Sequence, residues 1–351
     1  MAIDWTRGYT AHWRLYEVNQ STWTDGARLD GVVSASVERD CTGDAPELES
    51  ASIELDTPVT GDFSERVLRL VMVAEQNGET ERADICTMRF GATSGTIERG
   101  VHTRTLRGRS VLHTAAVAET WLDYGAYVPS GADGAAEVGK MLSDTITAPV
   151  EVIGSFVLQE SYVFDRSEHV LESAWAILKA GGYHIRIDGR GRVFVEREPT
   201  KPAYTLNQDT MRLLMPSVQP ELDWSDVPNR YTAIEGDSVY TITNDDAASV
   251  TSTVRRGYVV PVTDTSPIRI DGESLDAYAS RKLAELSVAS DKRRIEREYE
   301  PDIHINALVR ATIAQVGMEG DYRSKRQSLK CGAGIVVTEQ LEREVRSWPV
   351  S

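Results

Sequence analysis

The sequence has few cysteines, and none has a partner close by in the chain. Cys41, Cys86 and Cys331 are odd in number, far apart and without a neighbouring histidine pair. A disulfide framework needs an even set at regular spacings, and a zinc site needs closely spaced ligands. We therefore expect reduced thiols, mostly in the core, and no metal site.

Long apolar runs are also missing. No stretch approaches the roughly 18 to 20 apolar residues that cross a bilayer. Residues 1–13 have no basic segment leading into an apolar run, the pattern of an export signal. We expect no export or anchoring signal and no stable association with a membrane.

Basic charge is scarce: 38 Lys and Arg stand against 54 Asp and Glu, for a formal net charge of −16. Affinity for a phosphate backbone comes from Lys and Arg that displace counterions, so we do not expect a general nucleic-acid binder. An acidic surface remains compatible with a conduit, because a wall that repels DNA does not trap it during passage.

The usual phosphate-binding and nucleophile motifs are absent. The tight glycine clusters at 189–191 and 331–334 match neither GxxxxGK[ST] nor GxGxxG, and we interpret both as turns. Ser110 follows Gly-Arg but lacks the second glycine of a GxSxG elbow. The sequence therefore nominates no nucleophile.

Six histidines are scattered, with no HxH, HExxH or HxxxH spacing, so a metal site would have to assemble across the fold. Only His169, beside Glu168, could be argued as an acid–base residue, and we expect it to be a solvated side chain in the first turn of a helix. The histidines are His12, His102, His113, His169, His184 and His304.

Charged pairs offer two further candidates. Asp245-Asp246, or Glu47 with Glu49, could cleave a glycosidic bond if they flanked it, but 54 acidic residues produce such pairs by chance. Residues 292–294, Lys-Arg-Arg, could contact phosphate, but we expect a solvated helix end. We predict no catalytic, cofactor-binding or metal-binding residue, and no cofactor.

Seven tryptophans could form a sugar-binding platform or fill cores and subunit contacts. Trp13 and Trp175 fit core faces, whereas the others lie in less regular stretches. The seven are Trp5, Trp13, Trp23, Trp121, Trp175, Trp224 and Trp348.

From about residue 10 to residue 110 the apolar residues alternate with polar ones, as in half-buried strands. Residues 51–56, ASIELD, show this most clearly. Asn77-Gly78 supplies the positive φ angles of a tight hairpin turn. The pattern predicts antiparallel strands in a barrel or sandwich.

From residue 111 the pattern predicts a mixed domain. Helical spacing marks 134–146, and a second helix is predicted after Asp165, with Glu168 completing a capping box and Gly181-Gly182 ending it. A hairpin with its tip at 189–191 follows, and the prolines near Pro199 indicate a boundary.

The remaining segment returns to strands, interrupted by one helix over 273–290 with 292–294 at its end. The predicted strands are 229–236, 238–244, 249–262, 304–316, 328–334 and 335–341. We predict three domains: a β domain over 1–110, an α+β domain over 111–203 and a second β domain over 204–351.

In this order the features resemble bacteriophage tail hub proteins, also called baseplate hub, late-control or minor tail proteins. The resemblance lies in WRLYEVNQSTWTDGARLDGVVSASVERD at 13–40, in AWAILKAGGY and HIRIDGRGRVFVE at 174–196, and in the Gly320-Asp321-Tyr322 turn. It covers nearly the whole chain, but its motifs are structural and no catalytic residue can be transferred.

The resemblance implies two antiparallel β-barrel or sandwich domains of the tail-tube type that flank the helix-and-hairpin domain. It implies a non-enzymatic homotrimeric ring at the distal end of the virion tail, made in the host cytoplasm. The implied partners are a tail-tube or distal tail protein, tip, spike or receptor-binding proteins, and the tape-measure protein. DNA would be transit cargo during ejection.

Two other functions stay open from the residues alone. A cell-wall hydrolase would use two carboxylates, although no motif marks them. A module that binds host glycans would use the tryptophans, although the mixed middle domain and the lack of fibre-like repeats disfavour it.

Overall fold

The computed structural model describes residues 3–5, 8–56, 66–98, 101–120, 127–159, 161–207, 218–265, 267, 273–301 and 303–348. They belong to two compact units, Met1–Ser217 with Ile295–Gln340, and Val218–Arg294 with Leu341–Ser351. The described residues are mainly β with mostly antiparallel pairing, as the sequence predicts.

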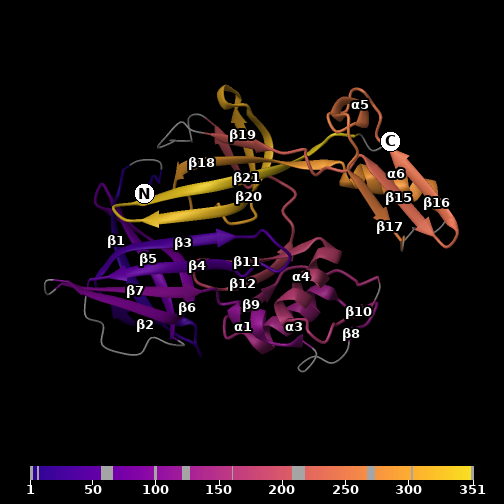
Figure 1. Ribbon diagram of the computed structural model, residues 1–351. Helices are drawn as coiled ribbons and strands as arrows, with labels where there is room; N and C mark the ends of the chain where they lie inside the picture. The colour runs from indigo at the N-terminus through magenta and orange to yellow at the C-terminus, as the bar shows by residue number, and fades with distance from the viewer. Residues whose placement is uncertain are drawn as a thin grey trace. The chain divides into compact units, whose positions relative to one another are not determined.

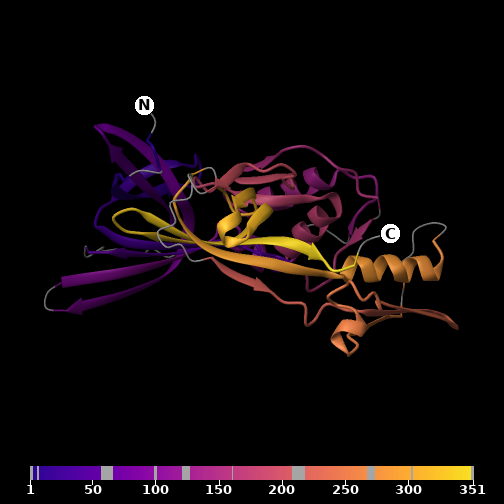
Figure 2. The same cartoon turned by 90° about the horizontal axis from the view of Figure 1, so that it is seen from above.

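The first unit is built on one large sheet. Its N-terminal strands are ordered β3-β4-β7-β6-β5-β1-β2, and Figure 2 shows the long β6–β7 hairpin from above in purple. Asn77 (φ 53°) and Gly78 (φ 82°) form the predicted turn between β5 and β6. The strands are β1 (Thr10–Asn19), β2 (Thr24–Leu29), β3 (Val32–Asp40), β4 (Leu48–Leu55), β5 (Arg66–Gln76), β6 (Glu79–Glu98) and β7 (Val101–Arg109).

Strands from the second half of the chain continue this same sheet. β20 pairs antiparallel with β3, so yellow and indigo strands lie side by side in Figure 1. The strand order is open, and the described strands form no closed barrel. The added elements are β13 (Tyr204–Asn207), β18 (Val288–Glu298), β19 (Leu308–Ile313), η1 (Ala314–Val316), β20 (Met318–Cys331) and β21 (Ile335–Arg346).

The middle of the chain forms the predicted mixture of helices and a hairpin. Leu142, Ile177 and Val195 meet in its core. The elements are α1 (His113–Val117), β8 (Tyr127–Val128), α3 (Gly134–Thr145), β9 (Val150–Val152), β10 (Tyr162–Val163), α4 (Val170–Gly181), β11 (Tyr183–Ile187) and β12 (Val193–Arg197). The predicted helix over 134–146 is confirmed by α3.

The predicted start of the second helix was wrong. Asp165 and Glu168 form a separate turn, in which the Asp165 amide donates to Glu168. His169 is the N-cap of α4, and Glu172 closes its capping box. Asp165 with Glu168 and His169 with Glu172 both have the three-residue spacing of a capping box. The first pair forms the separate turn, and the second pair begins the helix. Gly182, in the left-handed conformation, ends the helix as predicted.

The second unit contains a three-stranded sheet, β16-β15-β17, with α6 packed against it through Tyr278 and Leu283. The predicted strand over 249–262 was wrong, because Ser252 caps the short helix α5 and Gly257 ends it. The elements are β14 (Gln219–Leu222), β15 (Arg230–Glu235), β16 (Ser238–Thr243), α5 (Thr253–Arg256), β17 (Pro261–Asp264) and α6 (Leu275–Leu286). None of the described helices is both long and apolar enough to span a bilayer.

Candidate functional site

The histidines are spread over several elements, and each described ion pair joins one histidine to one carboxylate. His12 lies 3.6 Å from Glu75, and His113 lies 3.1 Å from Glu47. His169 contacts Glu172 at 3.2 Å rather than Glu168, as its N-cap position requires. The side chain of His102 lies outside the described part. No cluster of three possible metal ligands occurs among the described residues.

The three cysteines are free, and Cys86 and Cys331 are buried in the core as predicted. Burial raises the pKa of Cys331 to about 12 and that of Cys41 to about 11, and it raises the pKa of Cys86 well above its ordinary value. A thiol with such a pKa is protonated at neutral pH and is a poor nucleophile.

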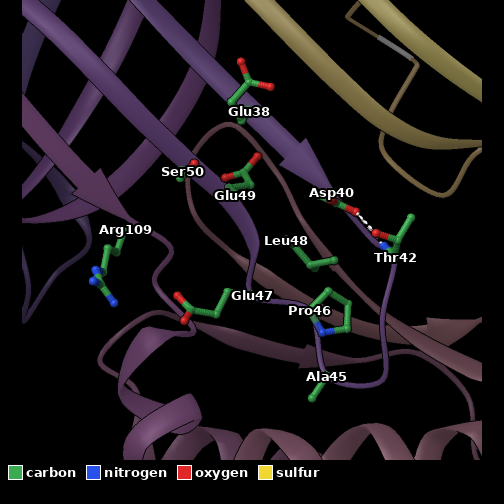
Figure 3. A pocket seen from close by; sticks show the side chains of 10 residues that line it. All are labelled: Glu38, Asp40, Thr42, Ala45, Pro46, Glu47, Leu48, Glu49, Ser50 and Arg109. Atoms are coloured by element: carbon green, nitrogen blue, oxygen red, sulfur yellow. Dashed lines mark hydrogen bonds between the residues drawn. The ribbon is translucent and has the colours of Figure 1, made fainter. Parts of the chain in front are cut away.

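An acidic depression of about 510 Å³ lies where β3 and β4 meet the turn between them (Figure 3). Three of its carboxylates have a partner elsewhere in the chain. Ser328 Oγ donates to Glu38 at 2.6 Å, Arg326 Nε lies 2.9 Å from Asp40, and Glu47 contacts His113. These three carboxylates therefore make contacts within the chain.

Glu47 and Glu49 bind different partners. Glu49 lies directly opposite Arg39 in the β3–β4 ladder, and successive strand residues point to opposite faces of a sheet. The Glu49 side chain therefore lies on the face away from Glu38 and Ser50, where Arg39 binds it. Glu47 precedes the strand and contacts His113 instead.

The other charged candidates have local structural roles. Asp246 accepts a 2.8 Å hydrogen bond from the Ala248 amide within a turn. The predicted helix end at 292–294 was wrong, because these residues belong to strand β18, where Lys292 lies 3.2 Å from Glu221. Helix α6 ends earlier, at Leu286, because Val288 begins that strand.

The described tryptophans make contacts within the chain. Trp13 Nε1 donates to the Gly332 carbonyl at 2.6 Å, and Trp175 Nε1 donates to the Pro46 carbonyl at 3.2 Å. Trp5 is buried edge-on to Tyr9 and Tyr299. Trp348 packs beside α6, Arg256 donates to the Trp224 carbonyl, and Trp121 lies outside the described residues.

The glycine-tipped hairpin does more than turn the chain. Its tip, Gly189 to Gly191, docks on β5 and β6. A Cβ on Gly189 would lie 1.7 Å from the Asp84 carbonyl oxygen, and one on Gly191 would lie 2.7 Å from Thr87 Cβ. Only glycine permits this close approach of two backbones.

Polar groups from the sheet complete the docking. Arg69, only 3% exposed, binds Asp25 at 2.5 Å and donates to the Arg190 carbonyl at 3.0 Å. Thr87 Oγ1 donates to the Gly189 carbonyl at 2.9 Å. The backbone carbonyls at the hairpin tip are thus satisfied by buried donors, which the interior of a protein requires.

A second set of buried polar residues crosses the sheet, and we call it the polar row. Arg39 Nε lies 3.0 Å from Glu49, Gln327 Nε2 donates to Glu339 at 2.9 Å, and Arg297 Nε lies 2.6 Å from Glu339. Its members lie on the adjacent strands β4, β3, β20, β21 and β18, and are Glu49, Arg39, Gln327, Glu339 and Arg297.

The two carboxylates of the polar row differ in pKa. Burial raises the pKa of Glu49 to about 7 against the pull of Arg39, and its Oε2 has no hydrogen-bond partner among the described residues. Burial also acts on Glu339, but Arg297, Ser324 and Gln327 together lower its pKa. Three residues donate hydrogen bonds to Glu339, whereas in the described part of the chain only Arg39 donates to Glu49. This difference in the number of donors explains the difference in pKa.

A signal for part of the polar row was present in the sequence. Ala35 and Val37 lie on one face of β3, and the next residue on that face is Arg39. Ala51 and Ile53 lie on one face of β4, and the preceding residue on that face is Glu49. A charged residue that continues an apolar stripe predicts a buried pair, because it can be buried only with a partner.

No family model matches the sequence. Nor does the sequence match any curated protein. Solved structures do match: the tail protein from Neisseria meningitidis MC58 has a TM-score of 0.64 at 14% identity, over 96% of this chain and 97% of that one. The 43 kDa tail protein of prophage MuSo2 from Shewanella oneidensis has a TM-score of 0.63 at 12% identity, over 96% and 99%.

The chain has the tail-protein fold. The resemblance that the sequence suggests is therefore confirmed at the level of the fold, over nearly the whole length of both tail proteins. Two groups of buried polar residues, at the hairpin tip and in the polar row, join strands and segments of this fold that are far apart in the sequence. Of their members, Glu49 also lines the depression at β3 and β4.

Proposed function

We propose that this chain is a structural hub subunit of a phage tail tip or baseplate. The observation that supports this most strongly is a fold shared along 96% of the chain with two tail proteins. The paired state of the described polar clusters supports a role without catalysis. In this proposal the chain works through its surfaces rather than through one site.

The hub would act as a homotrimeric ring at the distal end of the virion tail. The ring would continue the tail tube, join it to tip, spike or receptor-binding proteins, and leave a channel for DNA and the tape-measure protein. The net charge of −16 suits a channel wall or outer surface that does not retain DNA.

The domain layout belongs to the same proposal. We propose two β modules of the tail-tube type on either side of the α+β domain, with the predicted limits 1–110, 111–203 and 204–351. The sharing of one sheet by β3 and β20 would make the two modules interdependent.

Purified tails of a phage that encodes this chain test the proposal. We expect mass spectrometry to find the chain in the tail fraction and labelled antibodies to bind at the distal end. Cryo-electron microscopy of the same tails should show three copies around the axis. Absence of the chain from tails, or its presence along the whole tube, contradicts the proposal.

A further inference from the structure

We propose that the edge of strand β16 binds an extended β-strand of a different tail-tip protein. β16 lies at one end of the three-stranded sheet β16-β15-β17, so only one of its two sides is paired among the described residues. The other side presents backbone N–H and C=O groups, which are a template for strand addition. This inference rests on the proposed function, because the partner belongs to the tail tip.

The composition of β16 favours pairing. The strand Ser-Val-Tyr-Thr-Ile-Thr, residues 238–243, has no charge, no proline and no glycine. Five of its six residues, all but Ser238, are β-branched or aromatic and have high strand propensity. Val239 is 63% exposed and Tyr240 is 37% exposed. Such a strand is stable when both of its sides are paired, and it promotes aggregation when one side is unpaired.

Three other edge strands are protected against pairing. β14 contains Pro220 and Glu221, β17 contains Pro261 and Asp264, and β2 contains Asp25 and Arg28. Charges and prolines are the usual means by which proteins block an edge strand. Among the described edge strands, β16 is the longest that lacks a charge, proline and glycine.

The protected edges also indicate the occupant. In a three-fold ring, neighbouring copies meet through two different surfaces, whereas β16 against β16 would be a two-fold contact. A head-to-tail contact within the ring would need a second open edge, and Pro261 and Asp264 obstruct the one at the opposite side of this sheet. The strand that β16 receives therefore comes from another protein.

That strand should carry no charge opposite Val239 and Thr241. These two side chains lie on the sheet face away from α6, beside Ile234 and Thr232 of β15. Thr232 and Thr241 already share a hydrogen bond of 3.0 Å between their hydroxyls. Apolar or β-branched side chains in the incoming strand would extend this face.

Hydrogen exchange measured by mass spectrometry tests the pairing. The samples are the isolated chain and purified tails that contain it. About three new net hydrogen bonds should slow exchange of the outward β16 amides about a hundredfold in the tails. The amides of β14 should exchange at the same rate in both samples, because Pro220 and Glu221 disfavour addition there.

A matched pair of variants tests the consequence for assembly. Val239→Lys places a charge on the β16 edge, and Val254→Lys places the same charge on α5, where the valine is also 63% exposed. Both should fold, with melting temperatures within about 2 °C of the wild type. We expect Val239→Lys to enter tails at least about tenfold less well, and Val254→Lys to enter them normally.

The outcomes are distinct. Unchanged β16 exchange in tails that contain the chain, or normal assembly of Val239→Lys, overturns the inference and leaves the proposed function intact. Protection that appears already in the isolated chain together with dimers identifies a second copy as the occupant and also overturns it. If the chain is absent from tails, the proposed function fails and the inference fails with it.

Discussion

The indole Nε1 of Trp23 donates a 2.8 Å hydrogen bond to the carbonyl oxygen of Arg190, 167 residues further along the chain. The bond joins the turn before β2 to the tip of the β11–β12 hairpin. Arg69 donates to the same carbonyl from β5. These hydrogen bonds attach the helix-and-hairpin part of the chain to the large sheet through a backbone carbonyl at the hairpin tip. The glycines of the tip allow the close approach that the bonds require.

Gly189→Ala should disrupt the docking of the hairpin tip on strand β6. The added methyl group would overlap the Asp84 carbonyl, and backbone cannot yield as a flexible side chain can. We expect the free energy of unfolding in urea to fall by about 3 kcal/mol or more. Gly332→Ala is the control: no atom lies within 4 Å of its Cβ, and a loss above about 0.5 kcal/mol is not expected. Equal losses in the two variants would refute the docking argument.

Arg297→Ala should destabilise the protein strongly, because it leaves the fully buried Glu339 carboxylate without its cation. Removing one partner of a buried pair costs about 3 to 5 kcal/mol. Arg310→Ala is the matched control at an exposed pair with Asp321, and should cost less than about 1 kcal/mol. Chemical denaturation of both variants decides the point, and similar losses would count against a special role for the polar row.

Glu49 should make stability fall as the pH rises towards neutrality. Its pKa is raised from 4.5 to about 7 in the folded chain. Its protonated form therefore contributes stability that is fully present below about pH 4.5 and is lost as the pH rises through about 7. Unfolding free energies of the wild type and Glu49→Gln should converge at low pH and separate above it, by at most about 3 kcal/mol. A constant difference between pH 5 and 8 would contradict the raised pKa.

The cysteines should react slowly in the folded protein. With a pKa of about 11, Cys41 is roughly 0.1% thiolate at pH 8. Iodoacetamide labelling followed by mass spectrometry should find all three thiols largely unmodified in native protein and rapidly modified in urea. Fast labelling of Cys86 or Cys331 without denaturant would show that the core around them opens.

Local features of the fold could be predicted from the sequence. The Asn77-Gly78 turn, the helix over 134–146 and the hairpin at 189–191 each depend on residues that are close together in the chain. Turn chemistry and helical spacing act at that range. The start of α4 was misplaced by about one turn because Asp165-Glu168 and His169-Glu172 offer the same spacing, and only tertiary packing selects between them.

Long-range features could not be read in the same way. No residue pattern within β3 indicates that its neighbour in the sheet is β20 rather than another strand with the same alternation of apolar and polar residues. The docking of Gly189 depends on where Asp84 lies in space. The Arg39–Glu49 pair was not predicted, although a charge at the end of an apolar stripe on each strand indicates a buried partner. That signal does not identify Gln327 as the next member.

The pairing of β3 with β20 has a consequence for synthesis of the protein. Arg39 and Gln327 are separated by 288 residues. At about 5 to 20 residues per second, a ribosome needs roughly 15 to 60 s to make the segment between them. During that interval the edge of β3 that later binds β20 is unpaired. On a polysome, the same edge of a neighbouring nascent chain lies close by. We therefore expect nascent chains to depend on chaperones that prevent these edges from pairing with each other.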